Sequence, residues 1–148
     1  MLKDKKIIII GDKDGIAGSI IEDCIKTTEG EVIYAITECF GCMIGVDINL
    51  QKKIKELVLE SASKPIIILG SAEADTTELF LETIYKGDPT GLGPLDGREL
   101  GIKVYHITET VIKNECDEAV YKDKCGFMEM VIDTERIANI MFEKRNLY

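Results

Sequence analysis

The segment KIIIIGDKDG, residues 6–15, decides how this chain folds. Four consecutive isoleucines between charged residues, followed by a Gly- and Asp-rich turn, predict a short strand that is buried on both faces. The segment PIIILG, residues 65–70, repeats this pattern. Because strands buried on both faces belong to parallel sheets covered by helices, the sequence indicates an α/β fold.

The rest of the chain alternates strand and helix patterns. We expect strands at 6–10, 31–37, 65–69 and 101–107, and helices at 16–28, 48–62 and 76–85. A last strand at 127–132 and a final helix from Asp133 through Phe142 follow, whereas 108–125 is ambiguous. The alternation predicts one domain, residues 1–148, with a doubly wound, three-layer, mostly parallel sheet of the Rossmann or flavodoxin-like type.

Composition excludes several classes of partner. The 148 residues carry a formal net charge of −9, which argues against nucleic acid and anionic membranes as partners.

The first apolar run, residues 7–10, is too short and too closely flanked by charges for a signal peptide, so we expect a cytoplasmic protein. Five cysteines without a secretion signal do not indicate a disulfide framework, and a CxxC pair then points to redox or metal chemistry.

Ligands of parallel sheets bind beyond the carboxyl ends of the strands. Three unusual loops follow the first three expected strands, namely GDKDGIAGS, ECFGCMIGV and GSAEADT, and His106 ends the fourth. We therefore expect these segments to lie together at one edge of the sheet.

The pair Cys39 and Cys42 is the leading candidate site. A tight CxxC turn brings two sulfurs within disulfide distance. A free thiol has a pKa of about 8.5, and lowering it to about 7 increases the thiolate at pH 7 roughly 16-fold. However, the next expected helix begins only at residue 48, and Glu38 and Asp47 would oppose the shift if they lie close. Two unreactive thiols remain an open alternative.

A zinc site is the second hypothesis for these cysteines. It needs four ligands, and Cys116, Cys125 or His106 would have to complete the set. Eight residues separate Cys116 from Cys125, which is longer than the usual spacing.

The loop GDKDG allows a third hypothesis, because a strand followed by Asp-x-Asp-Gly resembles the nucleophile motif of haloacid-dehalogenase-type phosphatases. Asp12 would attack phosphorus, Asp14 would transfer protons, and Mg²⁺ would bind both. Gly11 interrupts the motif, however. The alternative is a turn in which Gly15 and Gly18 allow close approach of the backbone.

Two further candidates have equally plausible structural roles. Glu73 and Asp75 of the GSAEADT loop either orient a substrate amine or help to begin the next helix. His106 either donates a proton or has no catalytic role. We expect no bound cofactor or metal ion.

Five segments in order resemble the selenoprotein A family, component A of the bacterial glycine/sarcosine/betaine reductase complex. They are IIIIGDKDGIAG (7–18), TECFGC (37–42), GSAEAD (70–75), KGDPTGLGPLDG (86–97) and FMEMVID (127–133). The resemblance implies an oxidoreductase component in which Cys42 occupies the selenocysteine position. A sulfur there is less acidic and a poorer leaving group than selenium, so slower turnover is expected.

The resemblance also implies a reaction sequence. Residue 42 takes a carboxymethyl group from protein B and passes it to protein C, where acetyl phosphate is formed. Residue 42 is left bonded to Cys39, and the thioredoxin system reduces this bond. Asp12, Asp14, Glu38, Glu73 and His106 are the expected supporting residues.

Overall fold

A four-stranded parallel sheet forms the centre of the computed structural model, which describes residues 1–42, 45–95 and 100–148. Its strands are β1 (Lys6–Asp12), β2 (Glu31–Glu38), β3 (Ile66–Leu69) and β4 (Lys103–His106). Their spatial order is β2-β1-β3-β4, and every pairing is parallel. This order is that of flavodoxin-like folds, so the predicted fold class is confirmed.

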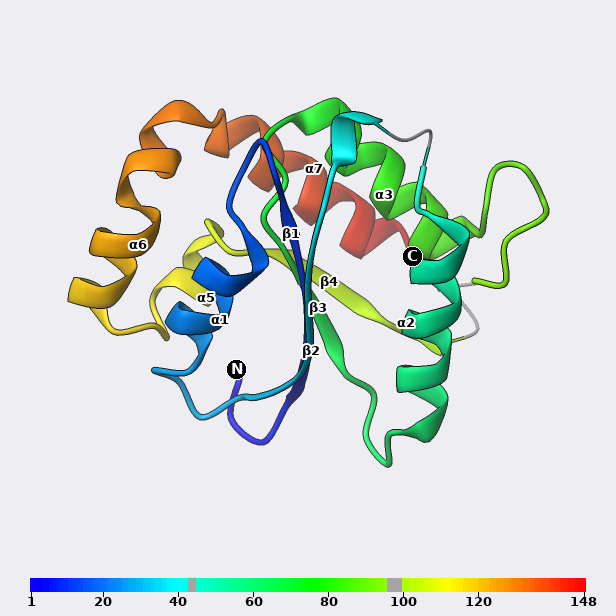
Figure 1. The fold of residues 1–148 in the computed structure, drawn as a ribbon, viewed down its shortest axis with the longest axis horizontal. Helices are drawn as coiled ribbons and strands as arrows, with labels where there is room; N and C mark the ends of the chain where they lie inside the picture. Colours follow the sequence, from blue (N-terminus) through cyan, green and yellow to red (C-terminus); the bar gives the residue numbers. More distant parts are fainter. Residues whose placement is uncertain (43–44, 96–99) are drawn as a thin grey trace.

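Helices cover both faces of the sheet (Figure 1). The left side in Figure 1 carries α1 (Gly18–Ile25), α5 (Thr110–Lys113) and α6 (Glu118–Val131). The other side carries α2 (Ile48–Glu60), α3 (Ala74–Lys86) and α7 (Thr134–Leu147), of which α7 packs on α3 and β4. No helix in these described ranges is long and apolar enough to cross a membrane.

The core is built on the two isoleucine-rich strands. The isoleucines of β1 and all four residues of β3 are buried and lie opposite each other in register, beginning with Ile7 beside Ile66. Each fully buried side chain of this size contributes about 1.5–3 kcal/mol to stability. The quoted segments therefore do supply the central pair of strands.

Two helix boundaries follow from side-chain hydrogen bonds. Asp47 caps α2 by accepting from the amide of Leu50 at 3.2 Å. The first helix ends at Ile25 and not at residue 28, because the Thr27 and Thr28 hydroxyls bond the Cys24 and Ile25 carbonyls at 2.6 and 2.7 Å.

The predicted strand at 127–132 is wrong, because residues 127–131 form the end of α6 and Ile132 is the residue that follows it. The ambiguous stretch before it contains α5 and the first half of the same helix. Tyr121 and Cys125 are buried on the α6 face toward the core, with Ile132 just beyond the helix. This spacing is helical, and Phe127 and Met130 between these positions are exposed. The apolar run was thus an exposed helix end.

Candidate functional site

Three loops meet at the carboxyl ends of β1, β2 and β3, and the carboxylate of Asp12 joins them. Asp12 ends β1 and lies opposite Glu38, the last residue of β2. Its Oδ1 accepts from the amides of Asp14 at 3.2 Å and Phe40 at 3.5 Å, and its Oδ2 accepts from Ala72 at 2.9 Å. Asp12 is only 2% exposed, so one buried carboxylate fixes all three loops.

Two glycines allow the loop after β1 to cross its neighbours. A Cβ at Gly15 would lie 2.2 Å from the Gly70 carbonyl oxygen, and a Cβ at Gly18 would lie 2.5 Å from that of Ile36. Both contacts are shorter than any side chain tolerates. The predicted close backbone approach at these positions is therefore confirmed.

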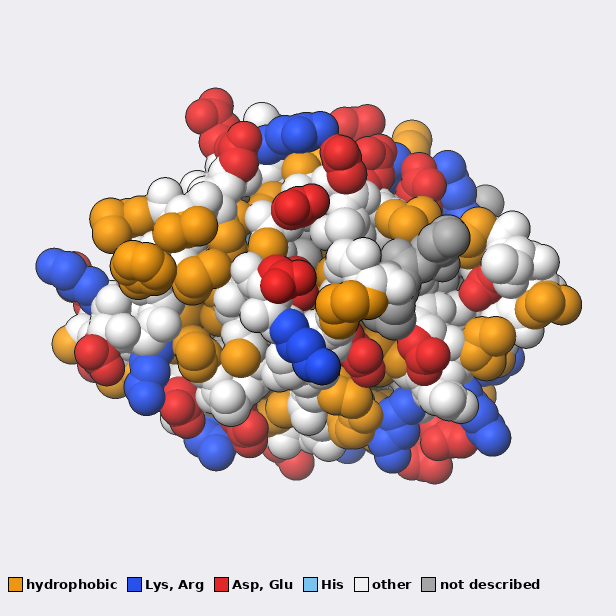
Figure 2. Space-filling model, turned by 45° about the horizontal axis from the view of Figure 1, so that its top comes forward, with side chains coloured by type: hydrophobic (Ala, Val, Ile, Leu, Met, Phe, Trp, Pro, Cys, Tyr) orange, Lys and Arg blue, Asp and Glu red, His pale blue; other side chains and the backbone are white. Residues whose placement is uncertain are grey.

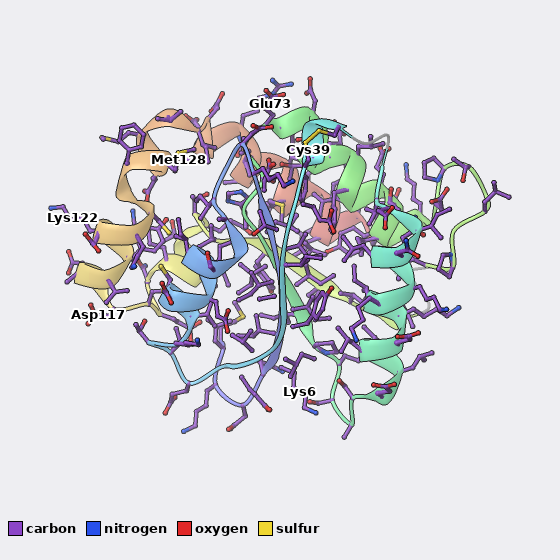
Figure 3. All side chains as sticks on the ribbon, in the orientation of Figure 1. Lys6, Cys39, Glu73, Asp117, Lys122 and Met128 are labelled. Atoms are coloured by element: carbon purple, nitrogen blue, oxygen red, sulfur yellow. A yellow bond between two sulfur atoms is a disulfide. The ribbon has the colours of Figure 1, made fainter. Side chains whose placement is uncertain are left out.

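Cys39 and Cys42 are joined by a disulfide on the loop after β2 (Figure 3). The sulfurs are 2.05 Å apart and the Cα atoms 5.4 Å apart. A short 3₁₀ helix, η1 (Phe40–Cys42), forms the turn, and the Cys42 amide donates to the Cys39 carbonyl at 3.2 Å. Cys39 is half-buried and Cys42 is exposed. The second residue of the pair is therefore the more exposed of the two.

An aromatic contact anchors this turn. Phe40, between the two cysteines, is buried and stacks on Phe80 of α3 with a centroid distance of 5.4 Å. The turn is thus held by the packing of the Phe40 ring and by the hydrogen bond from the Phe40 amide to Asp12. Gly41 and Cys42 remain exposed.

Acidic residues lie on the same loops as the disulfide. A Cβ at Gly41 would lie 3.8 Å from the Asp14 carboxylate, and Glu38 directly precedes Cys39. Partial burial, together with the carboxylate of Asp47, raises the pKa of Glu38, and Lys13 opposes this shift. Glu73 is exposed at the same edge of the sheet, where its side chain makes no capping hydrogen bond to α3 (Figure 3).

His106 is fully buried beneath the loops. Its Nε2 lies 2.9 Å from the Ser71 carbonyl oxygen, so Nε2 carries the proton, and its Nδ1 lies 2.7 Å from the Thr108 hydroxyl. Burial lowers the pKa of His106 to about 4. Both ring nitrogens are engaged, so the geometry supports a structural role, holding the loop after β3, over proton donation.

The geometry also bears on the two alternative hypotheses. The phosphatase hypothesis needs an accessible Asp12, but this carboxylate is buried and hydrogen-bonded at both oxygens. The zinc hypothesis needs further ligands from Cys116, Cys125 or His106. The Cys125 sulfur, however, lies 3.6 Å from that of Cys24 between α6 and α1, the Cys116 thiol bonds the Ile112 carbonyl, and both ring nitrogens of His106 are engaged. No group of three potential metal ligands occurs among the described residues.

Sequence reasoning brought the right loops together but missed the residues that fix them. The backbone amides of Phe40 and Ala72 carry no sequence signal as hydrogen-bond donors to Asp12. The Thr37 hydroxyl, which accepts from the Gly18 amide at 2.8 Å, was also missed. The aromatic residue inside CxxC was the one available signal, because a buried Phe in an exposed turn requires a hydrophobic partner.

Comparisons with known proteins agree on one family. The model of the family "Glycine reductase complex selenoprotein A" matches residues 2–145. "Glycine/sarcosine/betaine reductase complex component A" of Gottschalkia purinilytica is 45% identical over 144 residues, which are 95% of this chain and 96% of the relative. Component A2 of Photobacterium profundum is 48% identical, covering 93% of this chain and 87% of the relative. No solved structure matches the chain significantly.

Proposed function

Because this chain belongs to the glycine reductase complex selenoprotein A family, we propose that it is a redox-active carrier of a carboxymethyl group. It is a component A subunit, and the names of its relatives describe a multi-component reductase complex. Its proposed partners are proteins B and C of that complex and the thioredoxin system. The observation that carries the proposal is the bonded pair of sulfurs at an exposed turn within the residues that match the family.

In the first proposed step, the thiolate of Cys42 attacks the methylene carbon of an amino-acid adduct on protein B. A sulfur–carbon bond forms as the carbon–nitrogen bond breaks, and the amine leaves. The exposure of Cys42 supports its role as the attacking residue, because the carbon of a second protein has to reach it. The position of Cys39, half-buried and in bonding distance, suits a residue that acts only within this chain.

In the second proposed step, the thiolate of Cys39 attacks the sulfur of Cys42. A disulfide forms as the sulfur–carbon bond breaks, and the electron pair of the broken bond stays with the two-carbon unit. The methylene carbon of that unit takes up a proton, and its carboxyl group condenses with a thiol of protein C with loss of water to give an acetyl thioester. Phosphate then displaces the thiol, which releases acetyl phosphate and regenerates protein C. The thioredoxin system then returns two electrons to the disulfide.

The supporting residues have different proposed roles. Asp12 and His106 position the loops through backbone contacts. The carboxylates of Asp14, Glu38 and Glu73 lie on the loops at the same edge as Cys42, and their proposed role is to attract the positive charge of the amine that leaves.

Turnover with proteins B and C tests the proposal. Labelled glycine, phosphate and a dithiol would be supplied, and acetyl phosphate would be measured. We expect no product from Cys42→Ser, and accumulation of carboxymethylated Cys42 in Cys39→Ser. Cys24→Ala, which removes a buried thiol outside the site, should retain turnover.

Replacing Cys42 with selenocysteine provides the second readout. It should increase the rate, because a selenolate is the better nucleophile and leaving group. Full turnover in Cys42→Ser, or no turnover with either sulfur or selenium at position 42, would reject the proposal.

A further inference from the structure

A second pair of cysteines lies between α1 and α6, in the helical layer on the left of Figure 1. The sulfurs of Cys24 and Cys125 are 3.6 Å apart, although 101 residues separate the two positions along the chain. Both side chains are fully buried. The two sulfurs are therefore in direct contact, and neither takes part in the chemistry proposed for Cys39 and Cys42.

Two contacts hold α1 and α6 together before and after Cys24. The Asp23 carboxylate lies 3.4 Å from the Lys124 ammonium of α6. The Thr27 hydroxyl, just beyond α1, accepts from the amide of Asp117, the N-cap of α6, at 2.8 Å. A disulfide requires sulfurs about 2.05 Å apart, so each sulfur of the pair has to move by less than about 1 Å. The fold thus already holds two thiols close to bonding distance.

The two thiols differ in how easily they ionise. A hydrogen bond from Cys125 lowers the pKa of Cys24, and the same contact, together with burial, raises the pKa of Cys125. Burial raises the pKa of the neighbouring Cys116 thiol to about 12. Because the thiolate is the reactive form of cysteine, Cys24 is the nucleophile among the three buried thiols.

A cavity of about 610 Å³ lies beside this pair. Its lining includes Cys116, whose pKa is raised by burial and then by the nearby Cys24 thiol, and Tyr121, one helical turn before Cys125. The Tyr121 hydroxyl is buried and has no hydrogen-bond partner among the residues that the structure describes. It is therefore available to a small polar molecule that enters the cavity.

The surroundings favour a small, neutral oxidant. Figure 2 shows hydrophobic side chains gathered at the left, over the end of α6, and Met130 of this helix also lines the cavity. The charged lining residues balance, since Lys113 and Lys122 lie with Glu118 and Glu129. A protein disulfide is too large to reach two fully buried sulfurs, whereas hydrogen peroxide is small and uncharged.

We propose that Cys24 and Cys125 are an oxidation site, at which a peroxide forms a second disulfide that joins α1 to α6. The thiolate of Cys24 attacks one oxygen of hydrogen peroxide, the oxygen–oxygen bond breaks, hydroxide leaves and Cys24 becomes a sulfenic acid. The thiol of Cys125 then attacks that sulfur, and water leaves as the sulfur–sulfur bond forms. Hydroxide takes up the proton that Cys24 had lost. In total, two thiols are oxidised and one peroxide is reduced to two molecules of water.

This disulfide would stabilise the support of the site without consuming its cysteines. Cross-links that close long chain segments remove the most freedom from the unfolded chain, and this one joins positions 101 residues apart. Helix α1 follows the loop that Asp12 fixes, and the Gly18 amide at its start donates to the Thr37 hydroxyl of β2 at 2.8 Å. Cys39 and Cys42 stay free to react.

Peptide mapping after oxidation tests the site, and Cys39→Ser/Cys42→Ser removes the exposed pair from the reaction. The folded, reduced protein would be treated with hydrogen peroxide, then unfolded in N-ethylmaleimide and analysed by mass spectrometry. We expect one pair of peptides linked through Cys24 and Cys125, with Cys116 still a free thiol. The oxidised protein should unfold about 10 °C above the reduced protein, and reduction of the link should reverse this rise. The same link should form in the wild-type chain.

Cys116→Ser is the matched control, because it removes the third buried thiol and should leave the link intact. Cys125→Ser should prevent the link and leave Cys24 as a sulfenic acid that dimedone traps. A link from Cys24 to Cys116 would overturn the assignment. So would a link that forms only in denaturant, or free thiols at both Cys24 and Cys125 after the wild-type Cys39 and Cys42 are fully oxidised. None of these outcomes depends on turnover with proteins B and C.

Discussion

The carboxylate of Asp12 accepts a hydrogen bond from the amide of Phe40, the residue that follows Cys39. A residue at the end of β1 thus holds the turn that carries the two cysteines after β2. The same carboxylate also accepts from Ala72 after β3. The disulfide-bonded pair is therefore fixed to the sheet by one buried side chain.

Asp12→Asn tests this relationship. The side-chain amide of Asn has the same shape as the carboxylate of Asp. One carboxylate oxygen, which accepts a hydrogen bond, is replaced by an NH₂ group, and this donor would face a backbone N–H. We expect the free energy of unfolding to fall by about 1–3 kcal/mol, measured by urea denaturation. Asp14→Asn, at an exposed position in the same loop, is the control and should change stability by less than about 0.5 kcal/mol. Equal effects of the two substitutions would refute the structural role of Asp12.

His106 should make stability depend on pH. Its pKa of about 4 in the folded chain lies below the ordinary 6.5, so the unfolded chain binds the proton first as the pH falls. The stabilisation is fully present above pH 6.5 and is lost toward pH 4, in total about 3 kcal/mol.

Nuclear magnetic resonance can follow this residue directly, because it is the single histidine of the chain. We expect the ring to remain neutral in the folded protein at pH 5.5. In His106→Gln the loss of stability between pH 7 and pH 5 should be smaller than in the wild type. A folded-state titration near pH 6.5 would show that the ring is accessible and would contradict the burial described here.

Two glycine substitutions should have opposite effects. Gly15→Ala would place a methyl group 2.2 Å from the Gly70 carbonyl oxygen, so we expect a loss of at least about 3 kcal/mol. Gly126→Ala lies within α6, where the nearest atom is 3.7 Å away, so we expect a gain of about 0.5–1 kcal/mol from helix propensity. Thermal unfolding of both variants checks the pair, and a stable Gly15→Ala protein would contradict the tight loop crossing.

Much of the fold could be predicted because its strands carry strong patterns. The isoleucines of 7–10 and 66–68 have no plausible position other than a buried strand, and the four predicted strands up to 107 were all found. The error at 127–132 has a physical cause, because exposed apolar residues there interrupt the helical spacing.

The site was predictable to the level of loops and no further. Parallel topology alone brings Asp12, Cys39 and Glu73 to one edge. It does not reveal that Asp12 is buried, that His106 is engaged at both nitrogens, or that Phe40 anchors the turn. Those facts depend on side-chain packing between loops that are distant in sequence.

Selective alkylation tests the central claim most directly. The chain would be reduced, treated briefly with iodoacetate while folded, then unfolded and treated with iodoacetamide, and each cysteine would be assigned by mass spectrometry. We predict that the carboxymethyl group is found first on Cys42 and more slowly on Cys39, whereas Cys24, Cys116 and Cys125 react only after unfolding. A folded chain in which Cys42 stays unreacted while a buried cysteine is carboxymethylated would contradict the account.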